Sequence, residues 1–238
     1  MKRKIFIIGI VLVGLFTLTA CGQSDVSKIS DALKFKEEYE SLNGTKREKD
    51  GKTIRSIEIS KDNPFIYKKS SEIIDMIEKK DTFVVYFGFS DCPWCRSIIP
   101  TLVEVAADLE VNQIYYVDVK NIRDTMKIGD DGKAITDTEG TKEYYQLLEK
   151  LDSVLENYTL TDEDGNEVNT GEKRIYAPNI VSIVDGVATE MTTGISDKQT
   201  DGYMELTTEI KEESYDKIKC SIQCVADSKQ VCSAKTKC

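Results

Sequence analysis

Residues 82–95 read Thr-Phe-Val-Val-Tyr-Phe-Gly-Phe-Ser-Asp-Cys-Pro-Trp-Cys. The first six residues are β-branched and aromatic, which is typical of a buried strand. Beyond the second cysteine, apolar side chains recur at helical spacing, at Ile98, Leu102, Val105, Ala106 and Leu109. Cys92 therefore lies at or just before a helix N-terminus, and Cys95 lies one turn further on. Unpaired N–H groups and the helix dipole favour a thiolate there, as a redox-active cysteine pair requires.

Strands and helices alternate on both sides of this pair. The residue patterns predict strands at 53–59, 82–87, 114–119, 180–184 and 187–191, and helices at 71–80, 93–110 and 202–219. Ala177-Pro178-Asn179 precedes one of these strands, and Asp185-Gly186 forms a tight turn after it. The alternation predicts an α/β domain in which helices flank a central mixed sheet.

In this order the residues resemble the thioredoxin superfamily. The CxxC motif follows a strand, Pro100 lies five residues after Cys95, and Ala177-Pro178 stands where the family has a cis-proline before a strand. The Pro-Trp dipeptide is more similar to glutaredoxins and bacteriocin-transport accessory proteins than to thioredoxin itself. The resemblance covers roughly residues 53–212 and implies a thioredoxin-like fold.

The activity that this resemblance implies is thiol–disulfide exchange. Cys92 attacks, and the deeper Cys95 resolves the mixed disulfide. The implied catalytic residues are Cys92, Cys95 and Pro178, in an environment formed by Pro93, Trp94, Arg96, Tyr86 and Ala177. Pro93 preorganises the first helical turn, Trp94 screens the thiolate or contacts substrate, and Arg96 adds positive charge nearby.

Two residues depart from the thioredoxin pattern. Tyr86 stands where thioredoxins carry a buried carboxylate that helps to deprotonate the resolving cysteine, and a tyrosine is a poor base at neutral pH. Proton transfer at Cys95 must then use water or another group, such as Glu104 or Asp118. Asp91 replaces the tryptophan that precedes the motif, and its negative charge disfavours a nearby thiolate.

The N-terminal sequence predicts a lipoprotein signal peptide at 1–20. Basic residues at 2–4 precede an apolar stretch at 5–18, and Leu18-Thr19-Ala20-Cys21 is similar to a bacterial lipobox. Lipidation of Cys21 would hold the protein at the extracytoplasmic face of a bacterial membrane. An uncleaved anchor and an ordinary cleaved signal are the alternatives.

The remaining chain divides into a tether, a domain and a tail. The predicted boundaries are 21–35 for the tether, 36–212 for the thioredoxin-like domain with an insertion at about 121–173, and 213–238 for a Cys-rich extension. The insertion precedes the cis-proline loop and holds an amphipathic helix at 141–157 and a hairpin at 158–173. It either covers apolar surface as scaffold or sets specificity.

The extension carries four cysteines, at Cys220, Cys224, Cys232 and Cys238. An even number of cysteines in an exported chain indicates structural disulfides, although their pairing cannot be read from sequence. A zinc site of four thiolates is one alternative. Disulfide exchange with the Cys92–Cys95 pair is another.

Composition narrows the class of function. The chain has no histidine, which excludes Ser-His and Cys-His catalysis, and no cofactor or metal is expected at the candidate site. Its net charge of −10 argues against nucleic acid as a partner. The sequence thus predicts a membrane-anchored extracytoplasmic oxidoreductase that acts on protein or peptide disulfides with an unidentified redox partner. The alternatives are a non-catalytic accessory or chaperone module for exported peptides, and metal binding through the tail.

Overall fold

The computed structural model describes residues 22–235, and a five-stranded sheet lies at its centre. The strand order is β1-β3-β2-β8-β9, with β1 at Phe65–Tyr67, β3 at Ile114–Asp118, β2 at Phe83–Gly88, β8 at Asn179–Val184 and β9 at Val187–Thr192. β1, β3 and β2 are parallel, β8 is antiparallel to β2, and β9 is antiparallel to β8. The sheet is mixed, as the sequence predicted.

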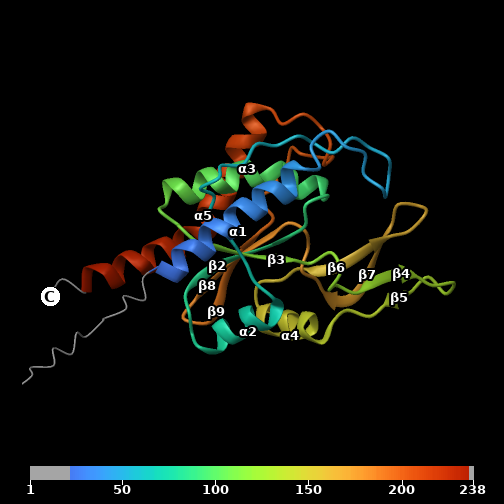
Figure 1. Cartoon of the computed structure of the whole chain (residues 1–238). Coiled ribbons are helices and arrows are strands. Elements are labelled where there is room, and N and C mark those ends of the chain that lie inside the picture. The colour runs from blue at the N-terminus through green and yellow to red at the C-terminus, as the bar shows by residue number, and fades with distance from the viewer. Residues whose placement is uncertain (1–21, 236–238) are drawn as a thin grey trace, which may run out of the picture.

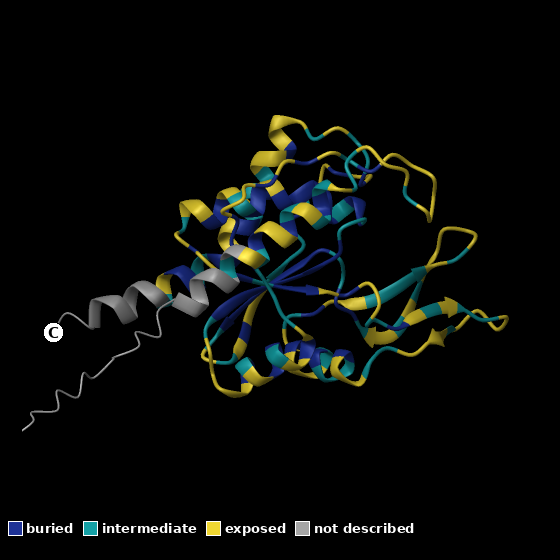
Figure 2. Cartoon of the chain, viewed as in Figure 1, coloured by how far each residue is buried: buried dark blue, intermediate teal, exposed yellow. Residues whose placement is uncertain are grey.

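Helices cover both faces of this sheet (Figure 1). The helices α1 (Gly22–Glu40), α3 (Pro93–Asp108) and α5 (Thr208–Lys235) lie on one face, and α2 (Ser70–Glu78) and α4 (Lys142–Leu151) lie on the other. Every residue of β2 is buried, and Figure 2 shows the sheet as a buried layer between helices whose outer sides are exposed. The predicted α/β class, a central mixed sheet flanked by helices, is confirmed.

The segment between β3 and β8 forms two hairpins and α4. One hairpin joins β4 (Thr125–Ile128) to β5 (Ala134–Thr138), and the other joins β6 (Asn157–Thr161) to β7 (Glu167–Lys173). The second hairpin lies where the sequence predicted one. The helix α4 packs on α2 and buries Tyr144, Leu147 and Leu151, so it covers apolar surface. It ends at Leu151 rather than 157, and the β4–β5 hairpin was not predicted.

The predicted tether at 21–35 is wrong over its second half. Residues 22–40 form α1, in which Ala32 and Phe35 are 3% and 0% exposed. The Phe35 ring stacks on that of Phe65 with 3.9 Å between centroids. Ala32, Phe35 and Tyr39 recur at intervals of three and four, so they form a narrow apolar stripe on an otherwise polar helix.

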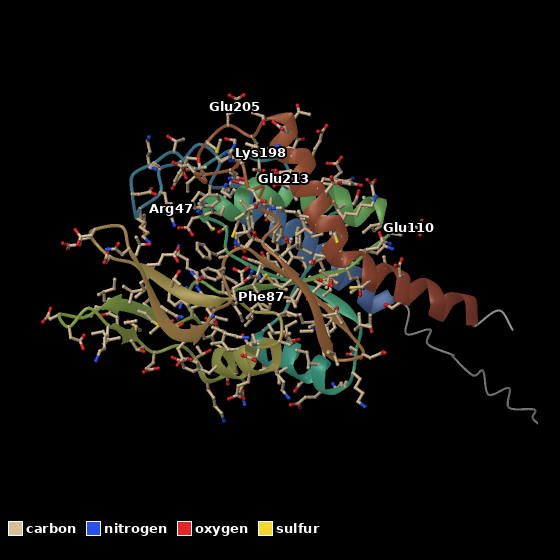
Figure 3. All side chains as sticks on the ribbon, turned by 180° about the vertical axis from the view of Figure 1, so that it is seen from behind. Arg47, Phe87, Glu110, Lys198, Glu205 and Glu213 are labelled. Atoms are coloured by element: carbon tan, nitrogen blue, oxygen red, sulfur yellow. The ribbon has the colours of Figure 1, made fainter. Side chains whose placement is uncertain are left out.

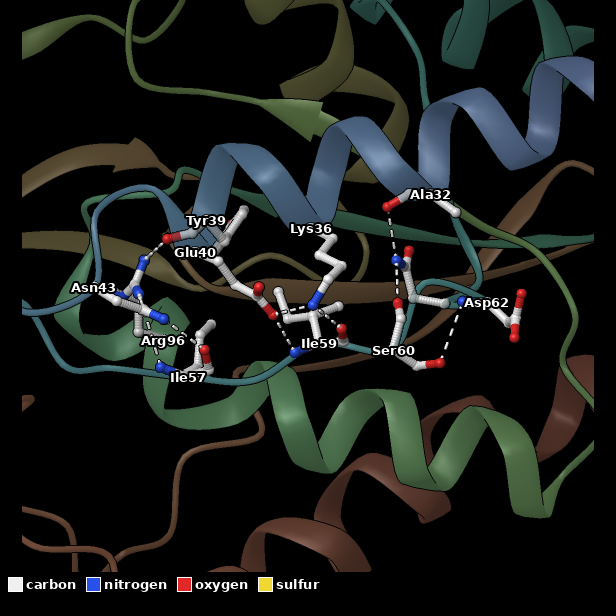
Figure 4. Close-up of polar contacts among 11 residues, drawn as sticks. Ala32, Lys36, Tyr39, Glu40, Asn43, Ile57, Ile59, Ser60, Asp62 and Arg96 are labelled. Carbon is white, nitrogen blue, oxygen red and sulfur yellow. Dashed lines mark hydrogen bonds and ion pairs between the residues drawn. The ribbon is translucent and has the colours of Figure 1, made fainter.

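The predicted strand at 53–59 is also wrong, although Ile57 and Ile59 are buried. The backbone of this segment pairs with side chains of α1 and the following turn (Figure 4). The Ile57 N–H donates to Asn43 Oδ1 at 3.1 Å and the Ile59 N–H donates to Glu40 Oε1 at 2.7 Å. Lys36 Nζ donates to the Ile59 carbonyl at 2.8 Å. These bonds satisfy the extended backbone, so no neighbouring strand is needed.

Arg96 is the largest fully buried side chain of the described chain. Its guanidinium donates to the carbonyls of Tyr39, Arg55 and Ser90 at 2.7–2.9 Å and to Asn43 Oδ1 at 2.5 Å. Figure 4 shows it reaching the C-terminal end of α1. Arg96 therefore ties α1 to α3, and its hydrogen bonds go to oxygens of that junction rather than to the sulfurs.

The predicted C-terminal helix at 202–219 begins later and runs further. The helix α5 is continuous over Thr208–Lys235, and Ile218, Ile222 and Val225 are fully buried. The extension from 213 is therefore a packed helix for most of its length. The signal peptide at 1–20, Cys21 and Cys238 lie outside the described residues. Within residues 22–235, no helix combines the length and apolarity needed to span a membrane.

The loop between β9 and α5 is fastened by Glu213 on that helix (Figure 3). Glu213 accepts hydrogen bonds from the Asp197 N–H at 2.8 Å and from the Ser196 hydroxyl at 2.7 Å. These bonds, with the Lys217 ammonium at 3.3 Å, lower the pKa of Glu213 from 4.5 to about 2. The ionised carboxylate is the form that holds the loop.

Glu213→Gln should lower the melting temperature at neutral pH, because the amide loses the charge that strengthens these bonds. A lowered native pKa contributes stability above the unfolded value, and this contribution disappears as the pH falls through the native value. The difference between wild type and variant should therefore shrink from about pH 4.5 towards pH 2. Melting curves across that range test it, and a constant difference contradicts it.

Arg96→Met should destabilise the fold by roughly 3 kcal/mol or more, because several buried oxygens lose their donor at about 1–3 kcal/mol each. Arg96→Lys retains the charge but not the planar fork, so it should fall between wild type and Arg96→Met. Denaturant unfolding measures both variants. Equal stability of wild type and Arg96→Met would show that the hydrogen bonds of Arg96 do not stabilise the fold.

Candidate active site

The cysteine pair lies at the N-terminus of α3, directly after the loop that follows β2. Cys92 is the N-cap residue, and its Sγ accepts a hydrogen bond from the Cys95 N–H at 3.3 Å. The same thiol donates to the Ala177 carbonyl at 3.2 Å, and the Ala177–Pro178 peptide bond is cis. The structure thus brings the predicted Cys92, Cys95 and cis-proline loop together.

The two thiols differ in their pKa values. Burial raises the pKa of Cys92, but hydrogen bonds from Cys95 and from the Trp94 N–H, together with the Arg123 guanidinium, outweigh it, so the net shift is downward. Burial raises the pKa of Cys95 far above its ordinary value, and the neighbouring Cys92 raises it further. Cys92 is therefore the thiol of the pair that loses its proton more readily, and Cys95 holds its proton more tightly.

Tyr86 lies beside the deeper thiol, at the position that the sequence singled out. Its hydroxyl acts on Cys95 by a hydrogen bond that lowers the pKa of that thiol, and it lies 3.3 Å from the Tyr39 hydroxyl of α1. Burial, followed by the charge of Cys95, raises the pKa of Tyr86 well above 10.0. Glu104 and Asp118 are exposed, and neither is a main influence on the Cys95 pKa.

Arg123 is a site residue that the sequence analysis missed. It follows β3, donates to the Ile175 carbonyl at 3.5 Å, and lies 5.5 Å from the centre of the Phe89 ring. Phe89 precedes the cysteine motif and Ile175 precedes the cis-proline, so Arg123 spans both sides of the site. The sequence did hold a signal for Arg123. It follows β3 as the cysteine motif follows β2, and the carboxyl ends of adjacent parallel strands meet at one sheet edge.

A buried ion pair fixes the backbone next to Arg123. Arg174 donates to Asp124 Oδ1 and to the Asp124 carbonyl, both at 2.8 Å, and Arg174 lies 4.2 Å from the centre of the Tyr158 ring. Asp124 is at the start of the insertion and Arg174 is at its end. The pair closes the base of the insertion and holds Arg123 beside the cysteines.

Asp91 does not act as an unpaired charge next to Cys92. Its carboxylate lies 2.9 Å from Lys120 Nζ and 3.8 Å from Arg47 Nε. These two cations offset its negative charge. The expected penalty on the thiolate is therefore reduced.

A groove of about 440 Å³ lies beside the cis-proline loop. Its lining includes Trp94, Tyr176, Ala177, Pro178, Glu156 and Asp197. Cys92 itself is only 3% exposed and does not line this groove. Pro93 is buried at the first turn of α3, where its lack of an N–H group costs no helical hydrogen bond.

The tail cysteines lie away from this pair on α5. Cys220 is exposed and Cys224 is half-buried, and both are free thiols. They are one helical turn apart on α5. Cys232 lies in the last turns of α5. No cluster of three or more potential metal ligands occurs in the described part of the chain.

The chain matches no protein-family model and no curated protein sequence. Among solved structures it is similar to thioredoxin O2 from Arabidopsis thaliana in the oxidized state. The two are 17% identical, the match covers 55% of this chain and 82% of that chain, and the TM-score is 0.30. A likeness this low carries no argument about function, which is therefore argued from the geometry of the site.

Arg123→Met should raise the pKa of Cys92, because the thiolate loses a nearby cation. Arg123→Lys should restore most of the shift. The ultraviolet absorbance of the thiolate reports this pKa, and subtracting the same protein carrying Cys92→Ser isolates it from the other cysteines. An unchanged titration in Arg123→Met contradicts the role.

Proposed function

We propose that this protein is a thioredoxin-like thiol–disulfide oxidoreductase that acts on disulfides of exported proteins or peptides. The observation that carries the proposal is the asymmetric pair, with the low-pKa Cys92 at the N-cap of α3 and the high-pKa Cys95 one turn inside. The cis-proline loop faces the first sulfur. This combination of strand, cysteine pair, helix and facing loop is what resemblance to the thioredoxin superfamily implies.

In the reductive direction, the Cys92 thiolate attacks one sulfur of the substrate disulfide. A Cys92–substrate bond forms, the substrate sulfur–sulfur bond breaks, and the departing substrate thiolate takes a proton from water. The Cys92 thiolate is ready for this step because its pKa is lowered by hydrogen bonds and by Arg123 against the effect of burial.

The second step resolves the mixed disulfide. Cys95 loses its proton and attacks Cys92 Sγ, so the Cys92–Cys95 bond forms and the second substrate thiolate leaves. Two electrons have then passed from the cysteine pair to the substrate, and a dithiol partner must reduce the pair again. In the reverse direction, the same steps transfer the disulfide to a substrate dithiol.

The membrane attachment is proposed from sequence. The lipobox-like residues 18–21 make Cys21 the proposed lipidation site, which would place the domain at the extracytoplasmic face of a bacterial membrane. Disulfides persist in that environment, which suits substrates of this kind. Structural disulfides that involve Cys232 or Cys238 remain a prediction.

One observation favours a second candidate function. Cys92 is nearly buried in its dithiol form, and such a pair is also suited to a static role in an accessory or chaperone module. In that case the groove beside Trp94 and Pro178 would hold an exported peptide without chemistry.

Reduction of insulin by a small dithiol separates the two functions. Wild type should accelerate the reaction, and Cys92→Ser should reduce the rate to that without protein. Cys95→Ser should trap a covalent adduct with the substrate, visible by mass spectrometry, because nothing resolves it. Cys220→Ser is the matched control and should retain activity. The oxidoreductase proposal fails if wild type and Cys92→Ser are equally active or equally inactive.

A further inference from the structure

Two segments of the chain supply most of the lining of the groove beside the cis-proline loop. Glu156 and Tyr176 flank the β6–β7 hairpin in the sequence, and the lining residues between 193 and 199 belong to the loop that joins β9 to α5. Ala177 also lines the groove, and its carbonyl accepts a hydrogen bond from the Cys92 thiol at 3.2 Å. A peptide held in this groove would therefore lie next to the attacking sulfur.

The charged side chains of this lining are both acidic. They belong to Glu156 and Asp197, and no lysine or arginine of residues 22–235 lines the groove. Lys217 Nζ lies 2.5 Å from Asp197 Oδ1 and 3.3 Å from Glu213 Oε1, so two carboxylates share one ammonium there. Glu156 is exposed and adds a further negative charge. The groove therefore carries an excess of negative charge.

Several hydrogen-bond donors of the same lining already have partners within the protein. The Tyr176 hydroxyl donates to a backbone carbonyl of β6 at 3.3 Å, and the Ser196 hydroxyl donates to Glu213 at 2.7 Å. The Gln199 amide donates to Ser97 Oγ at 2.8 Å. A carboxylate, in contrast, only accepts hydrogen bonds. A bound segment that brings its own N–H donors therefore suits this groove.

Two aromatic side chains complete this chemistry. Trp94 and Tyr176 line the groove and are half-buried. The face of an aromatic ring attracts a cation. A lysine or arginine side chain combines a positive charge and N–H donors with an apolar stem that packs on such rings. These two residue types therefore match the charge, the hydrogen-bonding groups and the rings of the groove.

We propose that this groove selects disulfide substrates that carry a lysine or arginine close to the reacting cysteine. The cationic side chain lies among Glu156, Asp197 and the rings of Trp94 and Tyr176, while the disulfide faces Cys92. Glu156 belongs to the insertion, so the insertion sets part of the specificity. This inference rests on the proposed function, because it names a class of substrates for the same site.

Two peptides of equal length test the selection. Each carries one cysteine joined by a disulfide to a nitrobenzoate thiol, and they differ only in having lysine or glutamate beside that cysteine. Attack of Cys92 on the peptide sulfur forms a Cys92–peptide disulfide and releases the coloured nitrobenzoate thiolate. Stopped-flow absorbance gives the second-order rate constant, after subtraction of the rate with Cys92→Ser.

Each rate constant is divided by that of mercaptoethanol with the same peptide, which removes the intrinsic reactivity of the peptide disulfide. Wild type should then react about tenfold faster with the lysine peptide than with the glutamate peptide, as two exposed carboxylates allow. High salt should reduce this ratio, because it screens exposed charges.

Glu156→Gln should lower the ratio of the two rate constants by about twofold to fivefold, because the groove loses one charge. Glu163→Gln is the matched control. It makes the same change to the net charge of the protein, but Glu163 is exposed in the turn of the same hairpin and does not line the groove. Its ratio should equal that of wild type.

A ratio of one or below with wild type overturns the selection, and so does an equal ratio in Glu156→Gln and Glu163→Gln. If wild type releases no more thiolate than Cys92→Ser with either peptide, the proposed function itself is overturned.

Discussion

The buried guanidinium of Arg96 is the interaction on which the active-site half of the fold depends. It follows the resolving cysteine directly and donates to oxygens from α1, from the turn after α1, from the 53–59 segment and from the loop before Cys92. A cation beside the last carbonyls of α1 also complements the negative end of that helix dipole. One side chain thus fixes the relative positions of the segments that surround the sulfurs.

The difference in pKa between Cys92 and Cys95 follows from where the structure stabilises a negative charge. Cys92 sits where N–H groups and the Arg123 guanidinium stabilise an anion, whereas Cys95 is fully buried, which disfavours one. The insertion takes part in this division, because the Asp124–Arg174 pair at its base holds Arg123 in place. Scaffold and site are therefore not separate parts of this chain. A segment that covers apolar surface also supplies a cation that lowers the pKa of Cys92.

Local sequence patterns were sufficient for the centre of the site and insufficient for its surroundings. The strand, the Cys92–Cys95 pair, the helix and the Ala177–Pro178 loop are each encoded within a few adjacent residues, so they could be predicted. The contact of Arg96 with Tyr39 joins positions 57 apart, and that of Tyr86 with Tyr39 joins positions 47 apart. The residues adjacent to Arg96 and Tyr86 in the sequence do not predict these contacts. For the same reason α1 was not predicted. Its apolar stripe is narrow, and the residues on which the stripe packs are distant in the sequence.

The position of α1 affects how far the domain can reach. Its helix begins at Gly22, one residue after the proposed lipidation site, and Ala32 is buried. At 1.5 Å per residue, the helix rises by roughly 15 Å from the one residue to the other. With lipid attachment at Cys21, as proposed, a flexible tether would let the cysteines sweep a wide volume above the bilayer, whereas a helix would set their height above it. Substrates of the proposed activity would then have to present their disulfides at that height.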